Sequence, residues 1–315
     1  MSLKDIKQKL NGPIFPTITP FKDDKTNSID YSSLIEYIDF LYSAGVRSFY
    51  VMTYNGRFSL LSWDEMKELN KVVTHHVKQK DEDCVVIVAD PITNPTSVSV
   101  DFAQHAEQIG ADLISCIFME RYHHDDQVYD HFKSIADNTN TGILIHAQEL
   151  EGIHGKCLYP IELLDRLADI PNVIAIKEDG KQPLYSEKVV KYISDRLNVI
   201  ISGRGKRQYL HYHNMGCQAY LVGVASFLPQ LAFKFHNAYH QRDMETVWGI
   251  INEIERPFFE IGMEFGWHPT LKSAMDIMGI MSRIERPPLC SLTTEQHDAV
   301  LKIIDNMKQS KYWSL

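Results

Sequence analysis

Lys177 ends a short apolar run, VIAI at residues 173–176, and two acids and a glycine follow it. An amine held among apolar neighbours loses hydration, which disfavours its charged form and lowers its pKa. A neutral lysine amine attacks a carbonyl to form a Schiff base, an electron sink for breaking an adjacent carbon–carbon bond. The alternative is a lysine that reaches water or pairs with Glu178 or Asp179.

Two other apolar runs lead to side chains that transfer protons. His146 follows GILI, residues 142–145, and its ordinary pKa near 6.5 suits acid–base chemistry at neutral pH. Tyr54 follows RSFYVMT, residues 47–53, and offers a phenolic hydroxyl as a second proton relay. The alternatives are a histidine satisfied by a neighbouring carboxylate and a tyrosine that simply packs.

Groups that bind anions follow Tyr54 directly. Asn55 supplies an amide donor, Gly56 a backbone N–H, and Arg57 a guanidinium that suits a carboxylate. Donors of these kinds are suited to an anionic group. For Arg57, an ion pair at the surface or at an interface is the alternative.

Three further residues, in or after later runs, are expected to contact the substrate. Gly203 and Arg204 follow NVIIS, and Leu221 lies within AYLVGVA. The cations Arg204 and Lys206 favour an anionic group at the distal end of the substrate, such as a second carboxylate or a phosphate. A solvated basic loop is the alternative.

Eight short apolar runs carry these residues along the chain. They are GPIFPTI (12–18), RSFYVMT (47–53), CVVIVAD (84–90), LISCIFM (113–119), GILIHA (142–147), NVIAIK (172–177), NVIISG (198–203) and AYLVGVA (219–225). Segments with helical periodicity, such as YSSLIEYIDFLYSAG, lie between them.

This alternation implies parallel βαβ units, and eight of them predict an α/β protein with a closed (β/α)₈ TIM barrel. A doubly wound sheet is the competitor, but no G-x-G-x-x-G follows the first run and no G-x-x-x-x-G-K-[ST] occurs. Active sites of such barrels form at the carboxyl ends of the strands, which directs Lys177 into the barrel mouth.

The pattern becomes purely helical after residue 228. We expect residues 1–228 to form the barrel core. Residues 229–315 are expected to form the last barrel helix and a C-terminal helical extension of the same structural unit.

Charge and composition exclude several classes of function. The net charge is -9 over 315 residues, without Lys/Arg clusters, which argues against nucleic acid and acidic membranes as partners. The 5 cysteines are scattered without a C-x-x-C pair, which argues against a zinc site or a disulfide framework. No run approaches the length of a membrane span, and the N-terminus lacks the apolar core of a signal sequence, so we expect a cytoplasmic protein.

Two clusters raise the question of a metal. His123-His124-Asp125-Asp126 is one, and His146 with Glu149 and His154 is the other. The second fits no familiar ligand spacing, and for the first an exposed loop that leads into a helix is the alternative. We therefore expect neither a metal nor a cofactor.

Motifs along most of the chain resemble the N-acetylneuraminate lyase and dihydrodipicolinate synthase family of pyruvate-handling class I aldolases. Between about residues 12 and 308 they read GPIFPTITPF, AGVRSFYVMTYNG, PNVIAIKEDG, ISG, GCQAYLVGVASFLP, LKSAMDIMG and RPPLCSLTTEQ. The resemblance implies that Lys177, in an I-K-E/D context, forms a Schiff base with a 2-keto acid. It also implies a homo-oligomer, either a dimer or a tetramer.

The family pattern is altered in three places. Residues 53–57 stand in place of the family's G-[ST]-T-G-E loop, which receives the keto-acid carboxylate, and only Gly56 is kept. The resemblance therefore implies that Asn55, Gly56 and Arg57 bind substrate. The family's Y-N-x-P places a tyrosine beside the lysine as a proton shuttle, and His146 stands at that position here. The next loop, QELEGIHGKC, lacks the arginine by which the dihydrodipicolinate branch holds its second substrate.

These residues together predict a Schiff-base-forming lyase, either a class I aldolase or a dehydratase, that acts on a 2-keto acid. The missing arginine argues against the synthase of the lysine pathway. The alternative is a catalytically altered barrel that binds a small molecule or serves in regulation. A metal-dependent aldolase or hydrolase on the same barrel is a third hypothesis.

Overall fold

The computed structural model describes residues 1–51, 54–118, 123–148, 150–152, 155–179, 182–202 and 206–313. Contacts between residues divide the chain into two compact units. The first comprises Met1–Pro16, Arg47–Tyr54 and Leu61–Leu221, and the second comprises Thr17–Val46, Asn55–Leu60 and Val222–Leu315. The predicted boundary at residue 228 stays a prediction.

A closed parallel barrel forms the centre of the first unit. Its strands, in order around the ring, are β1 (Gly12–Pro16), β2 (Ser48–Tyr50), β3 (Val85–Ala89), β4 (Leu113–Cys116), β5 (Gly142–Gln148), β8 (Val173–Asp179), β9 (Asn198–Ile201) and β10 (Ala219–Leu221). Pairing of β1 with β10 closes the ring. The eight apolar runs of the sequence form these eight strands, which confirms the predicted barrel.

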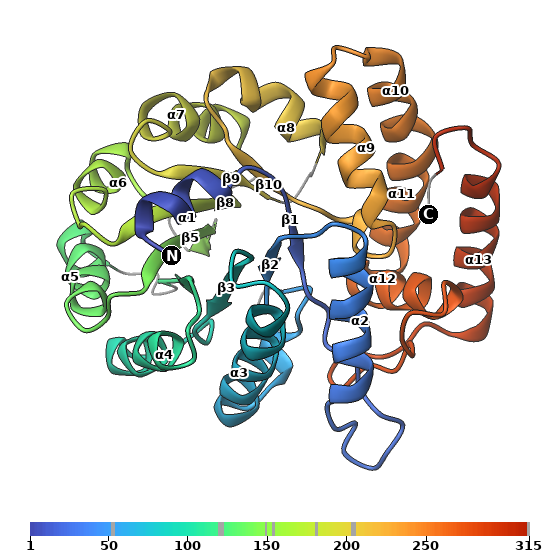
Figure 1. The fold of residues 1–315 in the computed structure, drawn as a ribbon, viewed down its shortest axis with the longest axis horizontal. Helices are drawn as coiled ribbons and strands as arrows, with labels where there is room; N and C mark the ends of the chain where they lie inside the picture. The colour runs from blue at the N-terminus through green and yellow to red at the C-terminus, as the bar shows by residue number, and fades with distance from the viewer. Residues whose placement is uncertain are drawn as a thin grey trace. The chain divides into compact units, whose positions relative to one another are not determined.

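Helices alternate with the strands of this unit, and Figure 1 shows them outside the strands. They are α3 (Trp63–Lys80), α4 (Thr96–Gln108), α5 (Asp125–Ala136), α6 (Ile161–Leu167), α7 (Pro183–Ile193) and α8 (Lys206–Tyr212). In α5, Val128, Phe132 and Ile135 are buried at helical spacing. The apolar stripe of such a helix packs on the strands, so the barrel is buried on both faces.

A short helix, α1 (Leu3–Lys9), precedes the barrel and was not predicted from the sequence. The side chain of Asn198, at the start of β9, donates hydrogen bonds to the carbonyls of Lys7 and Leu10. These bonds hold α1 at the amino-terminal ends of the strands, opposite the end that carries Lys177.

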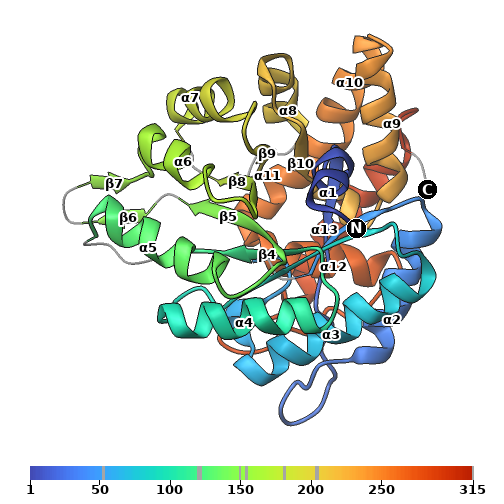
Figure 2. The same cartoon turned by 60° about the vertical axis from the view of Figure 1, so that its left-hand side comes forward.

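A small hairpin interrupts the alternation after β5. Strands β6 (Leu150–Gly152) and β7 (Gly155–Cys157) pair in antiparallel fashion and are seen at the left of Figure 2. The sequence indicated only a loop here, because QELEGIHGKC has neither an apolar run nor strict alternation.

The second unit is helical. It contains α2 (Tyr31–Ser43), α9 (Pro229–His240), α10 (Met244–Gly249), α11 (Arg256–Phe265), α12 (Trp267–Ile277) and α13 (Thr294–Lys308). A π-helical stretch, Ile250–Glu255, joins α10 to α11 just before Pro257, whose ring nitrogen has no N–H to donate to the preceding turn. The C-terminal helical extension is therefore confirmed. None of the helices in the described part of the chain is both long and apolar enough to cross a membrane.

Candidate active site

Lys177 lies on β8, and its side chain is only 2% exposed. Its Nζ atom lies 2.7 Å from Nε2 of His146 and donates a hydrogen bond of 2.6 Å to Oδ2 of Asp179. Residues i and i+2 of a strand face the same side, which places Asp179 beside Lys177. His146 arrives from the neighbouring strand, because the pairing of β5 with β8 sets it opposite Lys177.

This environment differs from the one that the apolar run predicts. The Lys177 amine contacts a carboxylate and an imidazole instead of lying among apolar groups alone. The pairing with Asp179 that the sequence left open as an alternative is present. This pairing is compatible with a chemical role for Lys177, because His146, a base, also contacts the amine.

The protonation states in this cluster follow from burial and charge. Burial, followed by the charge of Lys177, lowers the pKa of His146 to about 4. Burial alone would raise the pKa of Asp179, but Lys177 and His146 outweigh it and hold this pKa below its ordinary value. At neutral pH, the imidazole of His146 is therefore neutral and Asp179 is a carboxylate, so both accept hydrogen bonds from the Lys177 amine.

Tyr54 lies near this cluster but does not contact the lysine amine. Its hydroxyl donates a hydrogen bond of 2.7 Å to Oε1 of Gln148, and its ring meets the His146 ring edge-on with centroids 6.3 Å apart. Burial raises the pKa of Tyr54, an effect that the bond to Gln148 only partly offsets. Of the two predicted proton relays, His146 is the one within hydrogen-bonding distance of Lys177.

Asp179 and Gln148 are members of this cluster that the sequence did not single out for a function. They face each other in the β5–β8 register, two residues beyond the pair of His146 and Lys177. The i+2 spacing within VIAIKED and within ILIHAQ is the signal that could have found them, because it places both on the face of the reactive residue.

Arg57 belongs to the second unit and forms a buried ion pair. Its guanidinium donates two bonds to Oε1 and one to Oε2 of Glu285, and both side chains are 0% exposed. Further bonds run to the carbonyls of Asn55, at 2.6 Å, and His268, at 3.0 Å. The structure therefore shows an ion pair for Arg57, but a buried one and not the surface or interface pair that was the alternative. These protein groups occupy the donors expected to bind a substrate carboxylate.

Asn55 and Gly56 are held within the same unit. Oδ1 of Asn55 accepts a hydrogen bond of 3.1 Å from Nε1 of Trp267, so the NH₂ half of the amide is the half that remains to bind an anion. The hydroxyl of Thr19 donates to the Gly56 carbonyl at 2.5 Å. In the chain, Asn55 follows Tyr54 directly.

The remaining predicted site residues fall in different places. Leu221 is the last residue of β10 and is half-buried. Gly203 and Arg204 lie outside the described residues, as do Glu149 and His154. Lys206, the first residue of α8, is buried, which does not fit a solvated basic loop.

The structure offers no metal site within its described part. No three His, Cys, Asp or Glu residues there lie close enough together to hold an ion. His124 instead caps α5, where its Nδ1 accepts a hydrogen bond from the backbone of Asp126.

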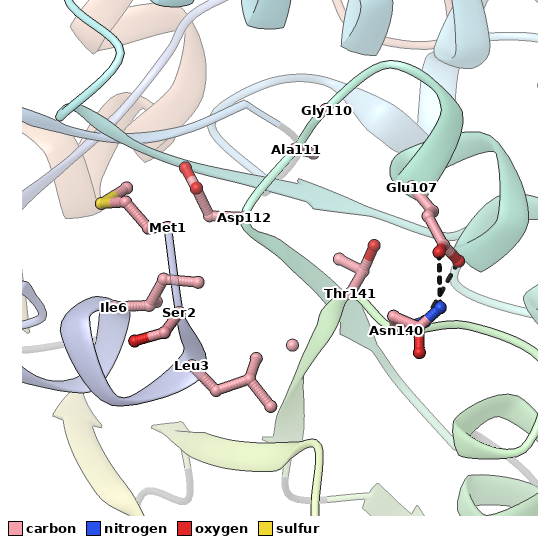
Figure 3. Close-up of a pocket in the computed structure, with 11 residues that line it drawn as sticks. Met1, Ser2, Leu3, Ile6, Glu107, Gly110, Ala111, Asp112, Asn140 and Thr141 are labelled. Carbon is pink, nitrogen blue, oxygen red and sulfur yellow. Dashed lines mark hydrogen bonds between the residues drawn. The ribbon is translucent and has the colours of Figure 1, made fainter.

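One pocket lies at the opposite end of the barrel from Lys177. It has a volume of about 420 Å³ and is lined by α1 and by residues that precede β4 and β5, including Asp112 and Thr141 (Figure 3). Its acidic groups already have partners, since Glu107 accepts a hydrogen bond from Asn140 and Asp112 pairs with Lys78. This pocket is therefore not the site of the lysine chemistry.

Comparison with known proteins places this geometry in a family. The model of the dihydrodipicolinate synthetase family matches residues 9–307. A 4-hydroxy-tetrahydrodipicolinate synthase of Psychrobacter arcticus is 27% identical over 94% of this chain and 95% of its own. A probable 5-dehydro-4-deoxyglucarate dehydratase of Allorhizobium ampelinum is 26% identical over 98% of this chain and 100% of its own.

A solved structure agrees in fold. It is the crystal structure of a prophage protein of the dihydrodipicolinic acid synthase family from E. coli K12 in complex with pyruvate. It superposes with a TM-score of 0.81 at 20% identity and covers 95% of this chain and 98% of that one. The matched family model spans nearly the whole chain, so this protein belongs to the dihydrodipicolinate synthetase family and is an enzyme of the lyase class.

Proposed function

We propose that this enzyme is a class I, Schiff-base-forming lyase that acts on a 2-keto acid. The observation that carries the proposal is the position of the Lys177 Nζ atom, 2.7 Å from a histidine nitrogen and buried at the carboxyl end of a barrel strand. A nucleophilic lysine with an adjacent base is the arrangement that imine formation requires. The pyruvate complex of the structural relative agrees with a 2-keto acid as substrate.

The chemistry begins with activation of the amine. The ammonium form of Lys177 passes one proton to Nε2 of His146, which lies 2.7 Å away and accepts it through the lone pair of the neutral imidazole. The free amine adds to the keto carbon, and an amine proton moves to the former carbonyl oxygen to give a carbinolamine. The His146 imidazolium then protonates the leaving hydroxyl, water departs, and a cationic imine remains on Lys177.

The cationic imine draws electrons from the neighbouring carbon and permits two outcomes. An aldolase breaks the next carbon–carbon bond after a base removes the proton of the adjacent hydroxyl group. A dehydratase removes a proton from the neighbouring carbon and expels a hydroxyl group as water. His146 is neutral again once it has protonated the leaving hydroxyl, so it is the base available to either route.

Asn55 and Gly56 are proposed to bind the substrate carboxylate through N–H donors. The free half of the Asn55 amide and the position directly after Tyr54 support this role. Tyr54 is proposed to orient Gln148 instead of moving the proton itself, because its hydroxyl is bonded to that amide. We propose that the enzyme is a dimer or a tetramer located in the cytoplasm. We also propose that its activity differs from that of the lysine-pathway synthase, because QELEGIHGKC has no arginine.

The test is to follow 2-keto-3-deoxy sugar acids of different length by NMR with the purified enzyme. An aldolase releases pyruvate and an aldehyde, whereas a dehydratase keeps the carbon chain and releases water. Lys177→Arg keeps the positive charge but forms no imine, so it should abolish either product. Product formation that survives in Lys177→Arg would reject the proposal.

A further inference from the structure

We propose that Asp179 is a catalytic residue of this site and acts as the counter-ion of the Schiff base. The inference rests on the proposed function, because it assigns a role in the same reaction. Its basis is a single oxygen, Oδ2, which lies 2.6 Å from the Lys177 nitrogen and 3.6 Å from Nε2 of His146. The side chain of Asp179 is 16% exposed, so the carboxylate is largely shielded from water.

The position of this oxygen lowers the free-energy cost of the first proton transfer, from Lys177 to His146. The positive charge moves from Lys177 Nζ to His146 Nε2 over 2.7 Å, and both atoms lie within reach of the same carboxylate. The carboxylate thus stabilises the charge before and after the transfer. In a site that excludes water, this interaction is stronger than it would be in solution.

The same oxygen also meets the intermediate. When water leaves the carbinolamine, the lysine nitrogen becomes an imine that carries one N–H and a positive charge. That N–H remains at the position from which the ammonium donates to Oδ2 of Asp179. A cationic imine buried without an anion would be costly, and Asp179 supplies that anion from two residues along the same strand.

Other titratable groups act on Asp179 within the first unit. Lys177 stands on the same strand, His146 on β5, Tyr50 at the end of β2 and Tyr54 after it. Burial raises the pKa of both tyrosines, so they stay neutral over the range in which the amine and the imidazole exchange a proton. The carboxylate is therefore the only negative charge among these five groups.

If Asp179 is the counter-ion, its removal should have two effects: the amine should react at lower pH, but less imine should form. Without the carboxylate, the protonated lysine–histidine pair is less stable, so the amine becomes reactive at lower pH. The cationic imine is also less stable, so less of it accumulates at a given concentration of keto acid. A residue that only maintained the fold would not separate these effects.

The experiment traps the imine with cyanoborohydride and pyruvate from roughly pH 5 to pH 9 and reads the adduct at Lys177 by mass spectrometry. The proteins compared are wild type, Asp179→Asn, Asp179→Ser and the charge-conserving Asp179→Glu. In the Asn and Ser variants we expect the pH midpoint of adduct formation to fall by about one unit or more. The half-saturating concentration of pyruvate should rise about tenfold or more.

Asp179→Glu should restore a midpoint close to that of wild type. A midpoint and a half-saturating concentration that do not change in Asp179→Asn and Asp179→Ser would overturn the assignment of Asp179 while leaving the Schiff-base proposal standing. No adduct in wild type with any 2-keto acid would instead reject the proposed function, and this inference with it.

Discussion

Arg57 and Glu285 form an ion pair from which solvent is excluded, although 228 positions separate them in the chain. Arg57 has a φ of 65°, a conformation that non-glycine residues seldom adopt. Its guanidinium ties the Asn55 carbonyl to Glu285 and to the carbonyl of His268. Arg57 therefore supports the loop that carries Asn55, through its bond to the Asn55 carbonyl.

This pair predicts a strong asymmetry between single and double substitutions. Arg57→Met leaves a buried carboxylate without its main partner and should lower the free energy of unfolding by about 3–5 kcal/mol. Arg57→Met combined with Glu285→Met removes both charges and should recover part of that loss, because Lys272, whose Nζ lies 3.8 Å from Oε2 of Glu285, then loses its carboxylate. Urea denaturation measures these free energies. A double variant that loses as much as the sum of the two single variants would show that the two charges are not coupled.

The different contacts of His146 and Tyr54, the two predicted proton relays, predict different effects of replacing each by phenylalanine. His146→Phe removes the nitrogen beside Lys177, so we expect it to lower turnover by about 100-fold and to slow adduct formation. Tyr54→Phe removes only a hydroxyl bonded to Gln148, so turnover should fall by less than about tenfold. Steady-state rates on the same 2-keto acid decide the point. If Tyr54→Phe were the more damaging change, the tyrosine would be the relay.

Stability should fall as the pH drops from 6.5 to 4. Burial lowers the pKa values of His131, His146 and His268 to about 4. Between that value and the ordinary 6.5, the unfolded chain binds more protons than the folded one, so acid favours unfolding. Burial raises the pKa of Asp90 to about 7, so this carboxyl contributes to the pH dependence of stability in the opposite direction. The contribution of one carboxyl is smaller than the summed contribution of the three histidines.

His131→Asn isolates one of these contributions. Nδ1 of His131 bonds to the Thr96 hydroxyl, and Nε2 is buried without a hydrogen-bond partner among the described residues, so a proton there would be unpaired. An asparagine retains a group that bonds to Thr96 but does not titrate. The difference in unfolding free energy between pH 7 and pH 4.5 should shrink by roughly 2–3 kcal/mol. An unchanged difference would mean that His131 is not protonated on unfolding.

The sequence predicted the barrel well because apolar strands buried on both faces leave a local signal. Placing His146 and Lys177 at the ends of such runs followed from that signal, and the register of β5 against β8 made them neighbours. The contact between Tyr54 and Gln148 could not be predicted, because it depends on side-chain geometry at the ends of strands that are not adjacent in the barrel.

The role of Arg57 was harder to predict, for a different reason. A guanidinium suits a substrate carboxylate and a protein carboxylate equally well. Nothing local to RPPLCSL marks Glu285, the residue just before it, as the partner of Arg57. Only the fold of the second unit brings the two together.

The most direct test of the central claim is to incubate the enzyme with pyruvate and borohydride and to record its intact mass. The account predicts a gain of one reduced pyruvyl group per chain, located at Lys177 by peptide mapping and absent from Lys177→Ala. Lys188→Ala, which removes an exposed lysine of α7, should be labelled like wild type. A pyruvyl group that still forms in Lys177→Ala, or that never forms in wild type with any 2-keto acid, would contradict the account.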